Sequence, residues 1–241
     1  MSLGIIGGMG PMASACFQEL IVELTDAKRD QDHLETICIN CPGIPDRTDY
    51  ILGRSEEDPS VEIIKIAKQL ESLGVSAIAV PCVTSAYFRK KVQAAVNVPV
   101  LYGLEKTARD LRTRGITRAG IMATEGSLKT GIIRDALSEY GIESVIPAEE
   151  DQQKTMDLIY KYVKSGCEDN VRLFDDVRRG LMEQGAQTVI LGCTELSVIN
   201  MRQHLKGDIT DILKSMAEES ITFCGKRVKR SSSLYAAAKC S

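Results

Sequence analysis

Two segments far apart in the chain share one pattern, and this internal duplication limits the possible folds more than any other feature. The segment SAIAVPCVTSA surrounds Cys82, and the segment QTVILGCTELS surrounds Cys193. Each segment is typical of a strand, a small residue, a cysteine, a threonine and the start of a helix. Because 241 residues suffice for two domains of roughly 100 to 120 residues, we expect two similar halves.

Short apolar runs rich in β-forming residues alternate with helical patterns in both halves, as in βα units around a parallel sheet. Strands are predicted at residues 3–6, 35–39, 77–80, 98–101, 118–122, 144–146 and 188–191. Helices are predicted at residues 11–24, 61–73, 128–140, 152–164, 170–184 and 208–224. The predicted fold class is α/β, with two similar parallel-sheet domains related by a pseudo-twofold axis and the active site in the cleft between them.

The domain boundary is expected near Gly103. Residues 1–102 and 208–225 are predicted to form the first domain, since the helical pattern of the later stretch can return to complete it, and residues 103–207 to form the second. The tail of residues 226–241 is basic and rich in small residues, so we expect it to be flexible.

The two cysteines are predicted to lie beyond the carboxyl ends of their strands, where open parallel sheets bind ligands. Alone, either Cys82 or Cys193 would be interpreted as a small buried core residue. At corresponding places in two similar halves, the pair indicates a functional site. A thiol at the start of a helix is favoured as a thiolate by the unpaired amides and the helix dipole.

Two facing thiols suit one kind of chemistry, in which a thiolate removes a proton from one face of a carbon and a thiol delivers a proton to the other. The stereocentre then inverts without any redox change. Disulfide exchange is disfavoured because the two cysteines do not form a CxxC. Acyl transfer by a Cys-His pair is disfavoured because neither His33 nor His204 lies in a motif.

The glycine-rich start, GIIGGMGPMA, admits two interpretations. Gly8, Gly10 and Ala13 satisfy the G-x-G-x-x-A pattern of dinucleotide enzymes. However, the second predicted strand ends in ICINC, without an acidic residue for a ribose hydroxyl, and Pro11 removes one amide. A tight turn whose remaining amides bind a carboxylate fits at least as well.

The composition argues against several other classes of protein. A net charge of -3 gives no general attraction to nucleic acid, and no apolar run approaches the roughly 18 residues of a membrane span. The start lacks the basic region of a signal peptide, so we expect a cytoplasmic protein with reduced thiols. Cys38 and Cys41 form a lone CxxC without suitably spaced histidines, so no metal is expected.

Further motifs occur in order along the chain: GIIGGMGP at the start, AKRDQDH at 27–33, IPDRTDYILG at 44–53, PC-x-T at 81–84, IYKYVKSG at 159–166 and LGCTE at 191–195. Over residues 3–224 the chain therefore resembles the aspartate/glutamate racemase superfamily, most closely the aspartate racemases. The resemblance implies a two-domain α/β fold. It also implies an activity that needs no cofactor, neither pyridoxal phosphate nor metal, and assembly as a homodimer.

The resemblance also implies roles for individual residues. Cys82 and Cys193 would be the acid/base pair at the α-carbon of an amino acid, with aspartate or glutamate favoured, and Arg47 and Lys164 would bind substrate carboxylates. From the residues alone, two alternatives remain: Arg47 can instead form a loop ion pair with Asp46, and Lys164 can be an exposed helix end. The remaining expected substrate-binding residues are Met9, Gly10, Val83, Thr84, Ser85, Thr194 and Glu195.

One departure from the family pattern bears on activity. The family usually has PCNTAH where this chain has PCVTSA, so Val83 replaces an asparagine and offers no side-chain hydrogen bond. Three alternatives therefore stay open: a non-catalytic binder of an amino acid or dicarboxylate, a related isomerase or lyase such as a maleate isomerase or arylmalonate decarboxylase analogue, and, more distantly, a nucleotide-dependent oxidoreductase.

Overall fold

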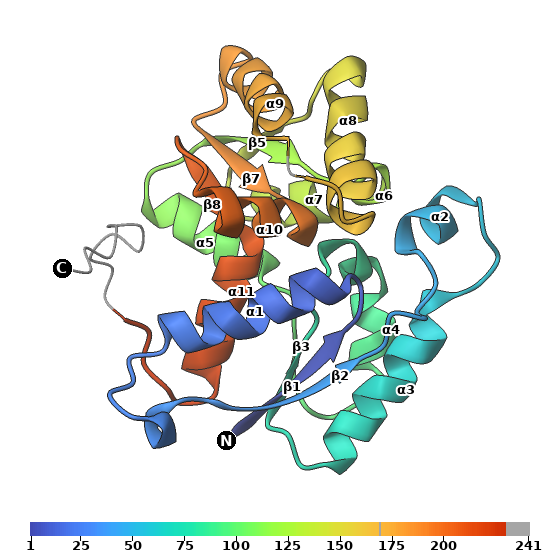
Figure 1. Cartoon of the computed structure of the whole chain (residues 1–241), viewed down its shortest axis with the longest axis vertical. Coiled ribbons are helices and arrows are strands. Elements are labelled where there is room, and N and C mark those ends of the chain that lie inside the picture. Colours follow the sequence, from blue (N-terminus) through green and yellow to red (C-terminus); the bar gives the residue numbers. More distant parts are fainter. Residues whose placement is uncertain (169, 230–241) are drawn as a thin grey trace.

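Two four-stranded parallel sheets form the centre of the fold in the computed structural model, which describes residues 1–168 and 170–229 (Figure 1). The first sheet has the order β2-β1-β3-β4 and the second has the matching order β6-β5-β7-β8. The predicted α/β fold with two similar parallel sheets is thus confirmed. The strands are β1 (Ser2–Gly7), β2 (Glu35–Asn40), β3 (Ala77–Ala79), β4 (Val100–Leu101), β5 (Arg118–Met122), β6 (Glu143–Val145), β7 (Thr188–Leu191) and β8 (Ile209–Asp211).

Helices cover both faces of the sheets. The α-helices are α1 (Pro11–Leu24), α2 (Arg47–Leu52), α3 (Pro59–Ser72), α4 (Arg89–Gln93), α5 (Leu104–Thr113), α6 (Glu125–Thr130), α7 (Ile132–Ser138), α8 (Glu149–Met156), α9 (Val171–Glu183), α10 (Thr194–Gln203) and α11 (Ile212–Phe223). Short 3₁₀ helices occur at η1 (Asp30–Asp32) and η2 (Val83–Phe88), and α8 continues into a π-helix, η3 (Asp157–Lys164).

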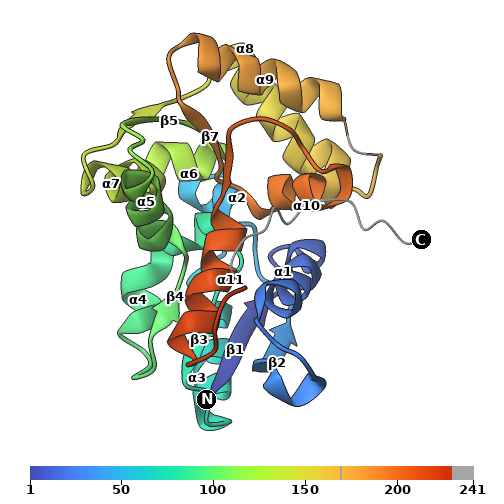
Figure 2. The ribbon, with the colours of Figure 1, turned by 90° about the vertical axis from the view of Figure 1, so that its left-hand side faces the viewer.

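Alternation along β1 explains how the first sheet is covered on both sides. Leu3 and Ile5 pack in one buried cluster with Phe17 of α1, whereas Ile6 packs in another with Ile63 of α3. Successive side chains of a strand point to opposite faces, so α1 and α3 lie on opposite sides of this sheet. Helix α11 packs beside α1, although the two are far apart in the sequence (Figure 2).

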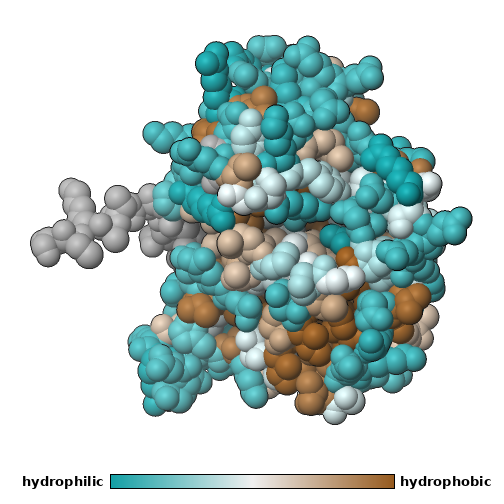
Figure 3. Space-filling view, turned by 45° about the vertical axis from the view of Figure 1, so that its right-hand side comes forward, coloured by the Kyte–Doolittle hydropathy of each residue, from teal (hydrophilic) through white to brown (hydrophobic). Residues whose placement is uncertain are grey.

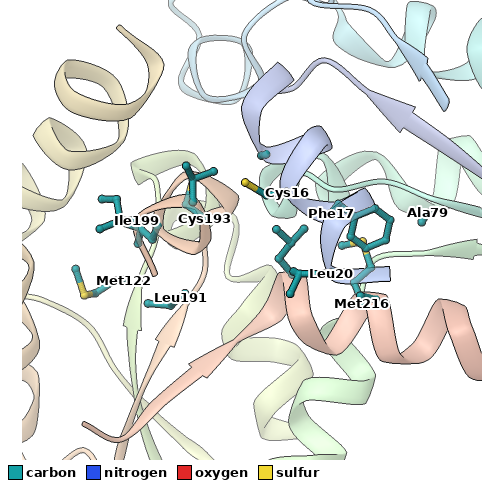
Figure 4. Packing of buried hydrophobic residues seen from close by; sticks show 14 of the residues in the cluster. Cys16, Phe17, Leu20, Ala79, Met122, Leu191, Cys193, Ile199 and Met216 are labelled. Carbon is teal, nitrogen blue, oxygen red and sulfur yellow. The ribbon is translucent and has the colours of Figure 1, made fainter. Parts of the chain in front are cut away.

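The two halves share a continuous apolar core. The cluster that contains Phe17 and Leu20 of α1 also contains Leu191 of β7 and Ile199 of α10 (Figure 4). On the surface, apolar residues gather in the lower part of the molecule, the half that holds the first sheet (Figure 3). In the described residues, 1–168 and 170–229, no helix is both long and apolar enough to cross a membrane.

Three predicted helices differ from the observed structure. The helix expected at 128–140 is interrupted by Gly131, whose φ of 69° separates α6 from α7. The helix expected at 152–164 begins at Glu149 and becomes a π-helix at Asp157. The helix expected at 208–224 begins only at Ile212, because the three preceding residues form β8.

The end of the described chain connects the two sheets. Strand β8 pairs with β7 in the second sheet, and α11, which follows at once, packs on the first. The expected division at residues 103 and 208 stays a prediction. Of the predicted tail, residues 226–229 are tied to the end of α1, since the amide of Lys229 donates to the carbonyl of Leu24 at 2.8 Å, and residues 230–241 lie outside the described part.

Candidate active site

The two cysteines of the duplicated motif lie at equivalent places and line one small chamber. Cys82 follows β3 and precedes η2, and Cys193 follows β7 and precedes α10. Each is only 5% exposed, and both border the chamber between the sheets. Its volume is about 10 Å³, which is room for little more than one water.

Cys193 is held as a thiol by its surroundings. Its Sγ donates a hydrogen bond to Oε2 of Glu195 at 2.9 Å. Burial and the Glu195 carboxylate raise the pKa of the Cys193 thiol well above its usual value, and Lys164 opposes this only in part. At neutral pH, Cys193 therefore carries its proton.

Cys82 has the opposite environment, because the guanidinium of Arg47 lies beside it. Arg47 is the first residue of α2 and is 7% exposed; its Nη1 donates to the carbonyls of Ile44 at 3.2 Å and Pro45 at 2.8 Å. Burial opposes the charge of Arg47, but Cys82 and then Asp46 raise the pKa of the guanidinium above its ordinary value. A fixed positive charge at this place stabilises negative charge on the Cys82 sulfur.

The second expected cation, Lys164, is paired with Asp46. Its Nζ lies 3.1 Å from Oδ2 of Asp46 and 3.9 Å from the ring centre of Tyr160. The Tyr160 hydroxyl donates to the same carboxylate, at 3.2 Å from either oxygen. Burial favours the neutral acid, but Lys164 and Arg47 hold the pKa of Asp46 below its usual value. Asp46 and Tyr160 are thus site residues that sequence reasoning missed, although the i, i+4 spacing of Tyr160 and Lys164 in IYKYVKSG was a usable signal.

An outer cavity of about 600 Å³ adjoins the chamber and shares with it Asp46, Arg47, Lys164 and Glu195. Of the expected site residues, Met9, Cys82, Val83, Thr84, Cys193 and Thr194 line the chamber, and Gly10 lines the outer cavity. Ser85 lines neither, because its hydroxyl donates to the carbonyl of Cys82 at 2.6 Å.

Thr84 connects the two halves at the chamber wall. Its hydroxyl lies 3.0 Å from both the Thr124 hydroxyl, just after β5, and the Ser127 hydroxyl of α6. Thr124 also borders the chamber and was not expected from the sequence. A larger cavity, of about 690 Å³ between α4, β4, α5 and α11, contains neither cysteine in its lining.

The glycine-rich loop is built as a tight turn. The amide of Gly8 donates to Oγ of Ser14 at 2.9 Å, so it is already engaged. A side chain at Gly8 would lie 2.3 Å from the backbone of Cys41, and its φ is 101°. These features weaken the dinucleotide interpretation of the glycine-rich loop. They also show that the CINC segment packs against Gly8. Among the described residues, no three His, Cys, Asp or Glu side chains are grouped to hold a metal ion.

Two buried polar atoms of the site have no hydrogen-bond partner within the described part of the chain. One is the donor Nε of Arg47, and the other is the acceptor Oε1 of Glu195. Unpaired buried polar groups are costly, so both favour a ligand that supplies the missing partners. A carboxylate suits the first atom and an ammonium group suits the second.

Alkylation measures the effect of Glu195 on Cys193. In Glu195→Gln the negative charge that raises the pKa of Cys193 is lost, so iodoacetamide at pH 8 should modify Cys193 about 3 to 10 times faster than in the wild type. Mass spectrometry of the peptides gives the rate, with exposed Cys167 of the same chain as internal standard. An unchanged ratio of the Cys193 and Cys167 rates would contradict this assignment.

The fold and the site define a class of α/β proteins in which two similar parallel sheets carry cysteines at the ends of matching strands. The chain belongs to the Asp/Glu/hydantoin racemase family, whose model matches residues 6–218. It is 26% identical over 211 residues to the broad specificity amino-acid racemase RacX of Bacillus subtilis, covering 86% of this chain and 90% of that protein.

Two solved structures show the same architecture. The Picrophilus torridus aspartate racemase is 31% identical, with a TM-score of 0.82 that covers 95% of this chain and 96% of that one. The glutamate racemase of Francisella tularensis, solved with D-glutamate, has a TM-score of 0.66 over 92% of this chain and 80% of that one. At 15% identity, the second likeness shows the fold alone.

Proposed function

We propose that this protein is an amino-acid racemase that needs no cofactor and uses Cys82 and Cys193 as its acid/base pair. The observation that carries the proposal is that both cysteines border one buried chamber while their neighbours differ in charge. Arg47 places a positive charge beside Cys82, and Glu195 keeps the proton on Cys193. In the proposed reaction, Cys82 would act as the base and Cys193 as the acid at this one chamber.

The unpaired atoms of the site suit the head group of an amino acid. The α-carboxylate would accept from Nε of Arg47, and the α-ammonium would donate to Oε1 of Glu195. The Cys82 thiolate would take the α-proton, and the electron pair left on the α-carbon would be stabilised by the nearby cations. The Cys193 thiol would then protonate the opposite face, leaving Cys82 as thiol and Cys193 as thiolate; the other enantiomer would use the reverse sequence.

The relatives support this activity. One is named a broad specificity amino-acid racemase and another an aspartate racemase. The motif resemblance puts aspartate and glutamate first among the substrates, with Lys164 as the second carboxylate-binding residue. A homodimer and a cytoplasmic location are further parts of the proposal that rest on sequence.

Racemisation is tested by incubating single enantiomers with protein dialysed against EDTA, followed by chiral chromatography. Formation of the opposite enantiomer without added cofactor supports the proposal. A panel of proteinogenic amino acids from which no opposite enantiomer forms, with the cysteines reduced, would reject it.

The main alternative is a related protein that binds an amino acid or dicarboxylate without turnover. Val83 favours it, because this side chain lines the chamber, is 1% exposed and cannot form a hydrogen bond. Calorimetry would then detect binding where chromatography detects no product. Fumarate formed from maleate would identify an isomerase of the maleate isomerase type instead.

A further inference from the structure

The cavity of about 690 Å³ lies outside the active site, at the β4 edge of the first sheet. Helices α4, α5 and α11 form its other walls. Its volume is in the usual range of pockets that bind small molecules, about 300 to 1,000 Å³. It shares no lining residue with the chamber or with the outer cavity of the active site, so an occupant here would be a second ligand.

Close packing of α11 and a side-chain bridge from α4 shape this cavity. Gly103, in the loop after β4, has a φ of 73°, and a side chain there would lie 2.8 Å from Cβ of Met216, so α11 packs tightly on the loop. This packing brings Glu219, three residues further along α11, to the cavity wall. On the other side, Oε1 of Gln93 accepts from the amide of Val100 at 2.9 Å and ties α4 to β4. The cavity is therefore preformed.

One buried hydroxyl of the lining lacks a hydrogen-bond partner. Tyr102 follows β4 and is 5% exposed, and its hydroxyl has no partner within the described residues. Burial raises the pKa of Tyr102 above its ordinary value, so the hydroxyl keeps its proton and can donate it to an acceptor. Because an unpaired buried hydroxyl is costly, this position favours a ligand that brings an acceptor oxygen.

The charged groups of the lining balance one another. Arg89 and Glu105 form an ion pair, with Nη1 and Oε1 2.8 Å apart. Lys90 adds a positive charge at the exposed rim, and Glu219 adds a negative one. Burial and then Glu105 raise the pKa of the Glu219 carboxyl above its ordinary value, and Arg109 opposes this in part. A positively charged partner would therefore be favourable at Glu219.

An amino acid with an apolar side chain matches these groups. Its zwitterion carries one carboxylate and one ammonium group, and it has no net charge, like the charged groups of the lining. The carboxylate suits the Tyr102 hydroxyl and the Lys90 charge, and the ammonium group suits Glu219. The aliphatic residues of the lining, which suit an apolar side chain, are Ala94, Val100 and Leu101.

We propose that this cavity is a second amino-acid-binding site, which takes a zwitterion with an apolar side chain through Tyr102 and Glu219. The ligand carboxylate accepts a hydrogen bond from the Tyr102 hydroxyl, and the ligand ammonium group donates to the Glu219 carboxylate. The site does not depend on racemase activity, so its test is separate from that of the proposed function.

Calorimetry with L-leucine tests the site, and two analogues test the need for both charges. 4-Methylpentanoate lacks the ammonium group, and 3-methylbutylamine lacks the carboxylate. Because each analogue loses a hydrogen bond that involves a charged group, each should bind about 10- to 150-fold more weakly than leucine. An analogue that binds as tightly as leucine would overturn the assignment of a zwitterion.

Two variants locate the binding. Glu219→Gln removes the charge at nearly equal size and should weaken leucine binding about 10- to 150-fold. Tyr102→Phe should weaken it about tenfold or more, yet unfold at no lower temperature than the wild type, because the lost hydroxyl has no partner in the described structure. Binding that both variants leave unchanged while Arg47→Ala weakens it would place leucine in the active site and overturn the proposal. Absence of any binding heat at millimolar leucine would overturn it as well.

Glu218→Gln is the matched control. Glu218 is the neighbouring carboxylate of α11, but it pairs with Lys106 at 3.0 Å and does not line the cavity. Its affinity for leucine should equal that of the wild type. An equal loss in Glu218→Gln and Glu219→Gln would reject a site at Glu219. If no amino acid is racemised, the proposed function fails, while these affinities still decide whether the second site exists.

Discussion

Replacing either Cys82 or Cys193 by serine is expected to lower kcat/KM for racemisation by about 10²- to 10⁴-fold, the usual contribution of a general acid or base. A serine hydroxyl is a far weaker acid than a thiol, so it neither removes the α-proton nor returns one at a useful rate. Chiral chromatography of each enantiomer measures the loss. Because each turnover uses both thiols, the two variants should be impaired in both directions.

A third cysteine provides the control. Cys167 is exposed and lies in neither cavity of the site, so Cys167→Ser should keep wild-type activity. In D₂O, a variant that keeps one of the two thiols can still exchange the α-proton of one enantiomer for deuterium. The deuteron returns to the same face, so the configuration is retained and the opposite enantiomer does not form. Full racemisation by a folded Cys82→Ser or Cys193→Ser variant would show that the two-thiol mechanism is wrong.

Arg47→Ala is expected to produce the second large effect. A charge-assisted hydrogen bond in a buried site contributes about 1.5 to 3 kcal/mol, so kcat/KM should fall about 10- to 150-fold. Stability should fall as well, because the guanidinium also binds the carbonyls of Ile44, Pro45 and Met9. Steady-state kinetics and thermal unfolding measure the two losses.

Two further variants separate charge from geometry. Arg47→Lys keeps the positive charge but loses the forked set of donors, so it should restore only part of kcat/KM. Arg134→Ala removes an exposed arginine whose partner is the adjacent Asp135, and it should change neither quantity. An Arg47→Ala variant with unchanged KM and kcat would refute the role of Arg47 in substrate binding.

Much of the fold could be predicted because it depends on local patterns that recur. The repeated strand and cysteine motif placed Cys82 after β3 and Cys193 after β7, and both sheets have the same strand order. The predicted bounds of α1, β5 and β7 agree with those observed. Strand β8 was missed because its three residues precede a longer apolar run that fits a helix equally well.

The site was less predictable because its polar contacts join distant segments. Asp46 and Tyr160 lie 114 positions apart, and only the tertiary fold brings the hydroxyl to the carboxylate. Ser85 was expected to line the pocket, but the tight 3₁₀ turn after Cys82 directs its hydroxyl to a backbone carbonyl. Residue types therefore indicated the chemistry, while the pairing of Lys164 with Asp46 required the structure.

Proton NMR of the reduced protein in D₂O, with L- and D-amino acids added one at a time, tests the central claim most directly. If Cys82 and Cys193 are the acid/base pair, the α-proton signal of at least one amino acid disappears while the deuterated opposite enantiomer accumulates, without added metal or cofactor. Retention of every α-proton signal across the panel would contradict racemase activity, and the protein would then be assigned as a ligand-binding member of its family.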